Sequence, residues 1–387
     1  MSLQNNPVID IIVTHRLYPG AGQDLYKYHK DNGMPALLVE HSFMSHPDRV
    51  TTFSFYNGRI ENIRDGINFR FLPELICYFK DFVYTLSAAL RYPCRFRFYI
   101  GCGGFNVLAG FILKLFGRVE KVIFYTIDFV PRRFKNPVLN DIYMLIDRIC
   151  VSKAHRTWNL NQRMAEGRQI CLNMPIRKFN RQRVVPIGIW PQNLPEIRKN
   201  IVKDKKLIFC GDLTETQGVD LVLECIADIV RVIPDFKFVI IGDGNYKEVL
   251  SGMTRRLNII SYVDFLGAIY EPKALYTQLC AARAGVAAYK ETPGSSVYFA
   301  DVTKPKTYLS CGLPVIITKI PAVSIEIFNR KMGIVIDYKK ADLVDAVLKV
   351  MTDDDFYLKC KHNAQDFISD LNWNKIFSTA IEEVKNG

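Results

Sequence analysis

The segment with the clearest chemistry joins one lysine to small and apolar residues. Residues 300–315 read Ala-Asp-Val-Thr-Lys-Pro-Lys-Thr-Tyr-Leu-Ser-Cys-Gly-Leu-Pro-Val, which places Lys304 just before an expected short helix over 306–310. Three small residues lie in the preceding loop: Gly294, Ser295 and Ser296. A cation, accessible backbone amides and a helix N-terminus favour binding of a phosphate group. A solvated lysine beside a helix start is the alternative.

The elements that would position this lysine belong to a repeated strand and helix pattern in the C-terminal half. Apolar strands are expected over 207–210, 236–241, 262–266, 284–288 and 315–318, with an amphipathic helix over 219–232. Strands alternating with helices build a parallel sheet, and its ligands bind beyond the carboxyl ends of the strands. We therefore expect Gly211, Gly242 and Gly244 on one rim with Lys304.

The first half alternates in the same way, which predicts a second α/β domain. Strands are expected over 8–15, 36–40, 51–56, 68–72, 96–101, 121–127 and 184–189, and helices up to about 33, over 74–91 and over 106–116. The polar stretch 191–206 is the expected linker, and the last 35 or so residues are helical in pattern. At 387 residues, two domains are expected.

The C-terminal motifs resemble those of GT-B glycosyltransferases of the retaining type, in particular the family 4-like, group 1 enzymes. The matching positions are Lys304, Tyr308, Leu309, Gly312, Pro314 and Val315, and four further glycine motifs occur in the family's order. The resemblance implies two facing Rossmann-like domains, each a parallel sheet flanked by helices. It assigns 1–190 to the acceptor side, 207–370 to nucleotide-sugar binding, and 371–387 to a helix that returns to the first domain.

The resemblance also implies transfer of a sugar from a UDP- or GDP-linked donor to a saccharide hydroxyl, in cell-surface polysaccharide or glycolipid synthesis. No metal or other cofactor is expected, because lysine and the helix dipole stabilise the leaving phosphate. Asp128 and Lys304 are the implied catalytic residues. Donor-binding candidates are Gly22, Gly211, Gly242, Gly244, Gly294, Ser295, Ser296, Asp301, Lys304 and Thr307. Arg132 and Arg133 are assigned to the acceptor or membrane side.

Several positions depart from the family pattern. Asp212 and Gln217 stand where many relatives carry an arginine and a lysine, and Thr307 replaces a glutamate that would bind the ribose. Lys304, Lys306 or cations of the first half must then hold the phosphates. Asp301 is the nearest acidic substitute for the missing glutamate. The departures also favour an alternative, a weakened GT-B protein that acts as a binding or partner subunit; a GT-B epimerase is a third hypothesis.

Candidate residues in the first half leave alternatives open. The turn at Gly20 and Gly22 resembles a glycine-rich loop near donor and acceptor, although a simple tight turn explains it equally. Asp128 ends an expected strand beside two arginines, where it could hold an acceptor hydroxyl, pair with an arginine or cap a helix. His15 is the one histidine expected at a strand end, so the identity of an acid or base stays open.

Charge is concentrated in the first half of the chain. Residues 1–190 carry 26 Lys and Arg against 14 Asp and Glu, which accounts for the whole net charge of +12. An acidic membrane surface or a phosphorylated substrate are candidate partners, and a solvated basic face is the alternative. Nucleic acid is not expected, because no nucleic-acid motif appears.

The cysteines and the apolar runs indicate the compartment. Ten cysteines are scattered without a Cys-x-x-Cys pair, which predicts reduced thiols, with neither disulfides nor structural zinc. No run reaches the 18 or so apolar residues of a membrane-spanning helix, and no signal peptide is recognised. We therefore expect a cytoplasmic protein that can contact the inner face of the membrane.

Overall fold

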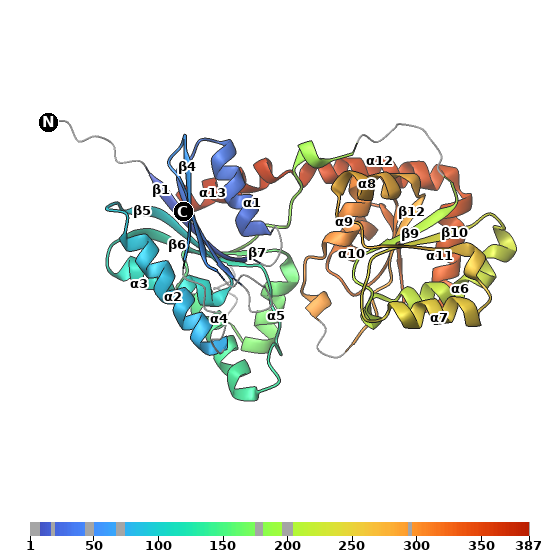
Figure 1. Cartoon of the computed structure of the whole chain (residues 1–387), viewed down its shortest axis with the longest axis horizontal. Coiled ribbons are helices and arrows are strands. Elements are labelled where there is room, and N and C mark those ends of the chain that lie inside the picture. Colours follow the sequence, from blue (N-terminus) through green and yellow to red (C-terminus); the bar gives the residue numbers. More distant parts are fainter. Residues whose placement is uncertain are drawn as a thin grey trace. The chain divides into compact units, whose positions relative to one another are not determined.

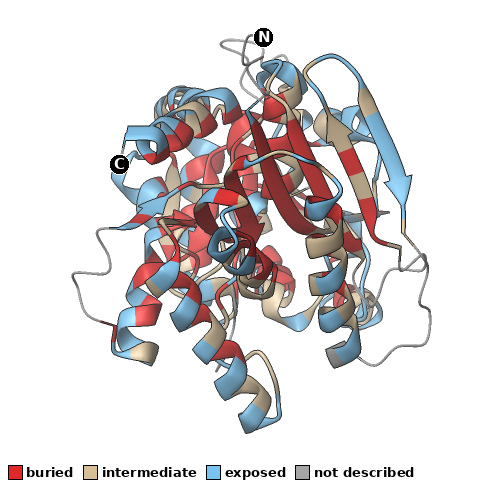
Figure 2. Cartoon of the chain, turned by 90° about the vertical axis from the view of Figure 1, so that its left-hand side faces the viewer, coloured by how far each residue is buried: buried red, intermediate tan, exposed pale blue. Residues whose placement is uncertain are grey.

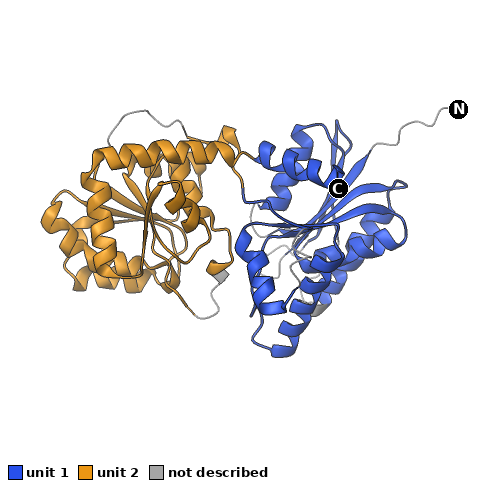
Figure 3. Cartoon of the chain, turned by 180° about the vertical axis from the view of Figure 1, so that it is seen from behind, with its two compact units in different colours: residues 1–187, 373–387 blue, residues 188–372 orange. Residues whose placement is uncertain are grey.

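The computed structural model describes residues 8–16, 20–42, 50–66, 74–174, 181–195, 204–292 and 296–386. The chain divides into two compact units, coloured separately in Figure 3. Unit 1 comprises residues 1–187 and 373–387, and unit 2 comprises residues 188–372. Within the described residues, no helix has both the length and the apolar character needed to cross a membrane.

Unit 1 is built on an eight-stranded sheet with the order β4-β3-β2-β1-β5-β6-β7-β8. The strands are β1 (Ile9–Arg16), β2 (Ala36–Ser42), β3 (Thr52–Tyr56), β4 (Glu61–Asp65), β5 (Phe96–Cys102), β6 (Val119–Thr126), β7 (Arg156–Asn159) and β8 (Gln182–Val184). All pairings are parallel except those of β3 with β2 and with β4. The central strands are apolar and buried, as expected for strands covered on both faces (Figure 2).

Helices cover both faces of this sheet (Figure 1). They are α1 (Ala21–Asp31), α2 (Glu74–Leu90), α3 (Gly104–Leu115), α4 (Pro137–Lys153), α5 (Gln162–Leu172) and α13 (Trp373–Asn386). Right-handed crossovers from β5 to β8 place α3, α4 and α5 on one face, and α2 packs against α3. α13 packs against α1, with the ring of Phe377 5.7 Å from that of Tyr28.

A buried arginine links three neighbouring strands of unit 1. Arg168 donates to both carboxylate oxygens of Asp147, at 2.7 and 2.9 Å, and to Thr126 Oγ1 at the end of β6. It also donates to Asn159 Oδ1 of β7 and Gln182 Oε1 of β8. The two charges of this pair compensate each other inside the unit, and the arginine connects β6, β7 and β8.

Unit 2 contains a six-stranded, fully parallel sheet with the order β11-β10-β9-β12-β13-β14. The strands are β9 (Lys206–Cys210), β10 (Lys237–Ile241), β11 (Val263–Gly267), β12 (Ala284–Ala287), β13 (Val315–Thr318) and β14 (Gly333–Ile336). The helices are α6 (Val219–Val232), α7 (Lys247–Arg256), α8 (Pro272–Ala281), α9 (Thr303–Ser310), α10 (Val323–Asn329), α11 (Lys340–Thr352) and α12 (Asp354–Asp370). Two α/β units with helix-flanked sheets confirm the predicted fold class.

Some predicted elements differ from the structure. The strand expected over 184–189 is wrong: β8 ends at Val184, and of the following residues Ile189 makes a single bridge to Asn372. The strand expected over 68–72 lies outside the described residues. The expected short helix begins earlier, at Thr303, so Lys304 lies inside its first turn and not before it.

Candidate functional site

The rim of unit 2 is formed by closely packed glycine turns after β9 and β10. Gly211, Gly242 and Gly244 have φ values of +144°, +150° and +156°, which favour glycine. A Cβ at Gly242 would lie 1.9 Å from the carbonyl oxygen of Gly211, and one at Gly244 would lie 2.4 Å from that of Leu213. The backbone of Gly211 donates to Ile241, the last residue of β10. The structure therefore brings these three predicted glycines together on one rim.

Lys304 reaches the same rim from the first turn of α9. Its ammonium donates to Gln217 Oε1 at 2.5 Å and lies 3.9 Å from the ring centre of Phe209 and 5.2 Å from that of Tyr289. A Cβ at Gly211 would lie only 2.9 Å from Lys304 Cε, so the missing side chain makes room for the lysine. Lys304 and Gly211 are thus in direct contact.

The ammonium of Lys304 is held without a carboxylate partner among the described residues. Burial lowers the pKa of Lys304 to about 7, an effect that Cys210 and Asp212 partly oppose. Its hydrogen-bond acceptor is a neutral amide, which orients the nitrogen but does not compensate its charge. A phosphate oxygen would supply the missing negative charge, so this side chain is suited to bind an anion.

The neighbouring candidates of α9 are engaged elsewhere. Lys306 Nζ lies 2.6 Å from Asp301 Oδ2, and both side chains are nearly buried. Lys306 was expected to help hold the phosphates, but its ammonium is already paired with this carboxylate. The hydroxyl of Thr307 donates to the carbonyl of Thr303 at 3.2 Å. Gly294 and Ser295 lie outside the described residues, and the described chain resumes in the short 3-10 helix Ser296–Tyr298.

A buried tyrosine fixes the helix that carries Lys304. The hydroxyl of Tyr308 accepts a hydrogen bond from the amide of Cys210 at 2.8 Å and donates to the carbonyl of Val286 at 3.3 Å. Its ring packs so closely on β12 that a Cβ at Gly285 would lie 2.3 Å from it. In the sequence, Tyr308 matches the family motif, but the motif does not indicate this role. The available signal was Gly285, because a glycine inside an apolar strand marks a place where another group approaches the backbone closely.

Unit 1 contains a separate cavity of about 360 Å³ at the carboxyl ends of β1, β5 and β6. Its lining includes His15, Asp128 and Arg133, together with the start of α3. Asp128 Oδ2 accepts a hydrogen bond from Arg133 Nη1 at 2.7 Å. Of the roles considered for Asp128, pairing with an arginine is therefore the contact that the structure contains. His15 Nδ1 lies 3.1 Å from Asn106 Nδ2, and burial lowers the pKa of His15 to about 4. The imidazole is therefore neutral at pH 7.

Glycines at two strand-to-helix turns of unit 1 have different roles. Gly22 lies in the first turn of α1, where a Cβ would be 2.8 Å from Thr14 Cβ and 3.0 Å from Cys102 Sγ. This close packing of helix on strand requires glycine, a role that differs from both the donor-binding loop and the tight turn considered for Gly22. A second turn, Gly103-Gly104, precedes α3 and lines the cavity. Its two adjacent glycines after an expected strand were a signal that the sequence interpretation missed.

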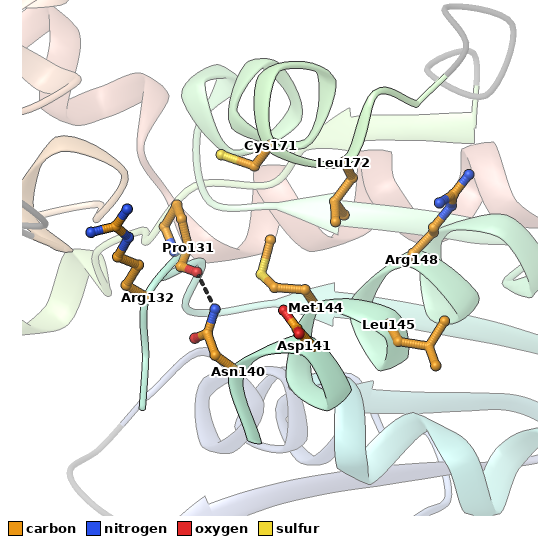
Figure 4. A pocket seen from close by; sticks show the side chains of 9 residues that line it. All are labelled: Pro131, Arg132, Asn140, Asp141, Met144, Leu145, Arg148, Cys171 and Leu172. Atoms are coloured by element: carbon orange, nitrogen blue, oxygen red, sulfur yellow. Dashed lines mark hydrogen bonds between the residues drawn. The ribbon is translucent and has the colours of Figure 1, made fainter. Parts of the chain in front are cut away.

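Arg132 lies apart from this cavity, on an open pocket of about 450 Å³ between α4 and α5. Figure 4 shows Arg132 and Arg148 on opposite sides of the pocket, with Met144 between them. Asn140 Nδ2 donates to the carbonyl of Pro131 at 2.8 Å and fixes the loop that carries Arg132. The two predicted arginines, Arg132 and Arg133, therefore serve different surfaces.

Comparisons with known proteins give a family match within unit 2 and a fold match for the whole chain. Residues 192–367 match the model of "Glycosyl transferases group 1". Anabaena Alr3699/HepE, solved in complex with UDP, is similar with a TM-score of 0.68 at 15% identity, over 98% of this chain and 100% of that one. No curated protein matches the sequence.

Two further solved structures are similar over nearly their whole length. WaaG, a glycosyltransferase involved in lipopolysaccharide biosynthesis, gives a TM-score of 0.65 at 13% identity, over 98% of this chain and 100% of that one. A trehalose-6-phosphate synthase studied for glycosyltransfer with retention gives 0.69 at 11% identity, over 98% and 99%. At these identities the similarity establishes the GT-B fold.

Proposed function

Because residues 192–367 form a group 1 glycosyltransferase domain in a chain with the GT-B fold, we propose that this protein transfers a hexose from a nucleotide diphosphate sugar to a saccharide hydroxyl. The family and the fold support a hexosyltransferase. One observation of the site carries the proposal: the ammonium of Lys304 lies among the rim glycines of unit 2 without a carboxylate partner in the described residues.

Lys304 is the residue to which we assign stabilisation of the leaving diphosphate. In the proposed step the bond between the sugar carbon and the phosphate oxygen breaks, and the acceptor oxygen forms a bond on the same face of the sugar. The acceptor proton passes to the leaving phosphate, so retention requires no protein base. The ammonium opposes the charge that develops on the leaving oxygens, and no metal is included in the proposal.

The similar proteins support our choice of donor and of biological role. HepE was solved with UDP, which favours a UDP-linked donor over a GDP-linked one. WaaG acts in lipopolysaccharide biosynthesis, which favours an acceptor on a growing polysaccharide or glycolipid. The similar trehalose-6-phosphate synthase was studied for glycosyltransfer with retention, which favours the retaining outcome for this chain. A lipid-linked acceptor would also require contact of the basic first half with a membrane.

The alternative is a GT-B protein that binds a partner without catalysing transfer. Asp212 and Gln217 favour it, because two cations of the family pattern are absent from the rim. Donor hydrolysis measured across a panel of UDP- and GDP-sugars decides between the two. Hydrolysis of one donor that is lost in Lys304→Ala supports the transferase, whereas absence of both hydrolysis and nucleotide binding across the panel supports the partner subunit.

A further inference from the structure

Neighbouring helices of unit 1 expose large apolar side chains on their outer sides. α2 packs against α3, and α3 packs against α4. On α4 the exposed fractions are 63% for Val138, 46% for Ile142, 55% for Leu145 and 38% for Ile149. A similar row on α2 consists of Ile76, Phe79, Val83 and Leu90. Several large apolar side chains exposed together on one side of a protein indicate a binding surface.

The α4 residues form a continuous stripe along the helix. Their spacing of four, three and four residues keeps all four side chains within an arc of about 60° at 3.6 residues per turn. The opposite side of α4 is buried against the unit and is mostly apolar, through Tyr143, Met144 and Cys150 among others, apart from Asp147, which pairs with Arg168. A helix that is apolar on two sides needs a partner for the second side.

The charges beside this stripe identify the partner. Arg132, Lys135, Arg148 and Lys153 are all exposed near α4, against one exposed carboxylate on the helix, Asp141. Among the described residues, none of these four cations pairs with a carboxylate. Arg132 and Arg148 also line the open pocket of Figure 4, whose lining includes Leu145 and Leu172 on the side of Arg148. An apolar stripe flanked by uncompensated cations complements the interface of an anionic bilayer.

We propose that this surface, the α4 stripe with Arg132 and Arg148, docks on an anionic lipid bilayer. The apolar side chains enter the headgroup boundary, and the two arginines contact lipid phosphates. The inference deepens the membrane contact of the proposed function and rests on that function for its purpose, although lipid binding is measured without sugar transfer.

Vesicle flotation tests the proposal. The full chain floats with phosphatidylcholine vesicles that contain phosphatidylglycerol, floats weakly with phosphatidylcholine alone, and is released by raised salt. Leu145→Asp lowers the partition coefficient at least about tenfold, because it places a carboxylate in the apolar interface. Arg148→Glu lowers it at least about fivefold on acidic vesicles. The matched control is Phe328→Asp on α10 of unit 2, whose side chain is 71% exposed and which leaves flotation unchanged.

The outcomes separate this inference from the proposed function. Equal flotation of Leu145→Asp and the unaltered chain, or no flotation on acidic vesicles, overturns the docking surface. A thermal melt and a UDP titration of Leu145→Asp verify that the variant is folded. Normal UDP binding without flotation removes only the docking surface, whereas flotation without nucleotide binding or donor hydrolysis removes only the transferase.

Discussion

Replacing Lys304 by methionine removes the ammonium and keeps an unbranched side chain of similar length against Phe209 and Gly211. If the ammonium binds a phosphate oxygen, the lost hydrogen bond to a charged group is worth about 1.5–3 kcal/mol. Since each 1.4 kcal/mol changes an equilibrium constant tenfold, the Kd for UDP should rise about 10- to 150-fold. This estimate applies where Lys304 is protonated before UDP binds.

The pH dependence provides an independent signature of the same contact. With a pKa of about 7, Lys304 is half protonated at pH 7 and roughly one tenth protonated at pH 8. Binding that requires the charged form should therefore weaken about fivefold between these pH values, while UDP itself stays ionised. Lys304→Met should lose this dependence.

Isothermal titration with UDP at pH 7 and pH 8 measures both effects. The control is Lys290→Met, because Lys290 lies beyond β12 and pairs with Glu215 at 2.6 Å. That variant should bind UDP as the unaltered chain does. At pH 7 only half of the unaltered chain carries the charged Lys304, so the expected rise in Kd for Lys304→Met is at least about fivefold at this pH. A Kd for Lys304→Met within about threefold of the unaltered value at pH 7 would refute the role assigned to Lys304.

Three further predictions concern stability. Without UDP, Lys304→Met should raise the Tm more at pH 6 than at pH 9: the pKa of Lys304 is lower in the folded than in the unfolded chain, so its destabilising effect is largest below pH 7 and fades towards the unfolded pKa. Gly218→Ala should strongly lower the free energy of unfolding, because the new Cβ would lie 1.8 Å from a carbonyl oxygen and the backbone has a φ of +67°. Gly252→Ala on α7 should instead raise the free energy of unfolding by about 1 kcal/mol, because its Cβ would point into open space. Urea unfolding measures both changes. Arg168→Leu should cost about 3–5 kcal/mol by leaving Asp147 unpaired, and an unchanged denaturation midpoint would contradict this.

The sequence predicted the strands of unit 2 more completely than those of unit 1, for physical reasons. In unit 2 short apolar strands end at glycines, so pattern and punctuation agree, and the predicted strand 315–318 coincides with β13. In unit 1, α4, β7 and α5 were not predicted. The buried sides of α4 and α5 include an ion pair between Asp147 and Arg168. These charged residues interrupt the periodic apolar pattern by which a helix is recognised in a sequence. The β3–β4 hairpin was also missed, although Asn57-Gly58 is a hairpin signal.

The candidate site was predictable in position but not in pairing. Glycines after parallel strands and a lysine in a family motif suffice to place Gly211 and Lys304 on one rim. The contact of Lys304 with Gln217 joins residues 87 positions apart, and no local pattern encodes it. The short-range pairing of Lys306 with Asp301 likewise depends on side-chain conformations. Both pairings decide which cation remains available for a phosphate.

One departure from the family pattern at this rim, Gln217, contacts Lys304 directly. A lysine at position 217, which the resemblance implies for many relatives, would bring a second ammonium near that of Lys304, and the two charges would repel unless a diphosphate lay between them. Gln217 instead offers a carbonyl oxygen, so one ammonium can be held in place before the donor binds. Gln217 thus orients the ammonium of Lys304, but the rim has one positive charge fewer than it would have with a lysine at position 217. If the proposed function is correct, Lys304 is the cation of the described rim that would hold the diphosphate, and its protonation changes near pH 7. We therefore expect donor binding at this rim to be sensitive to pH.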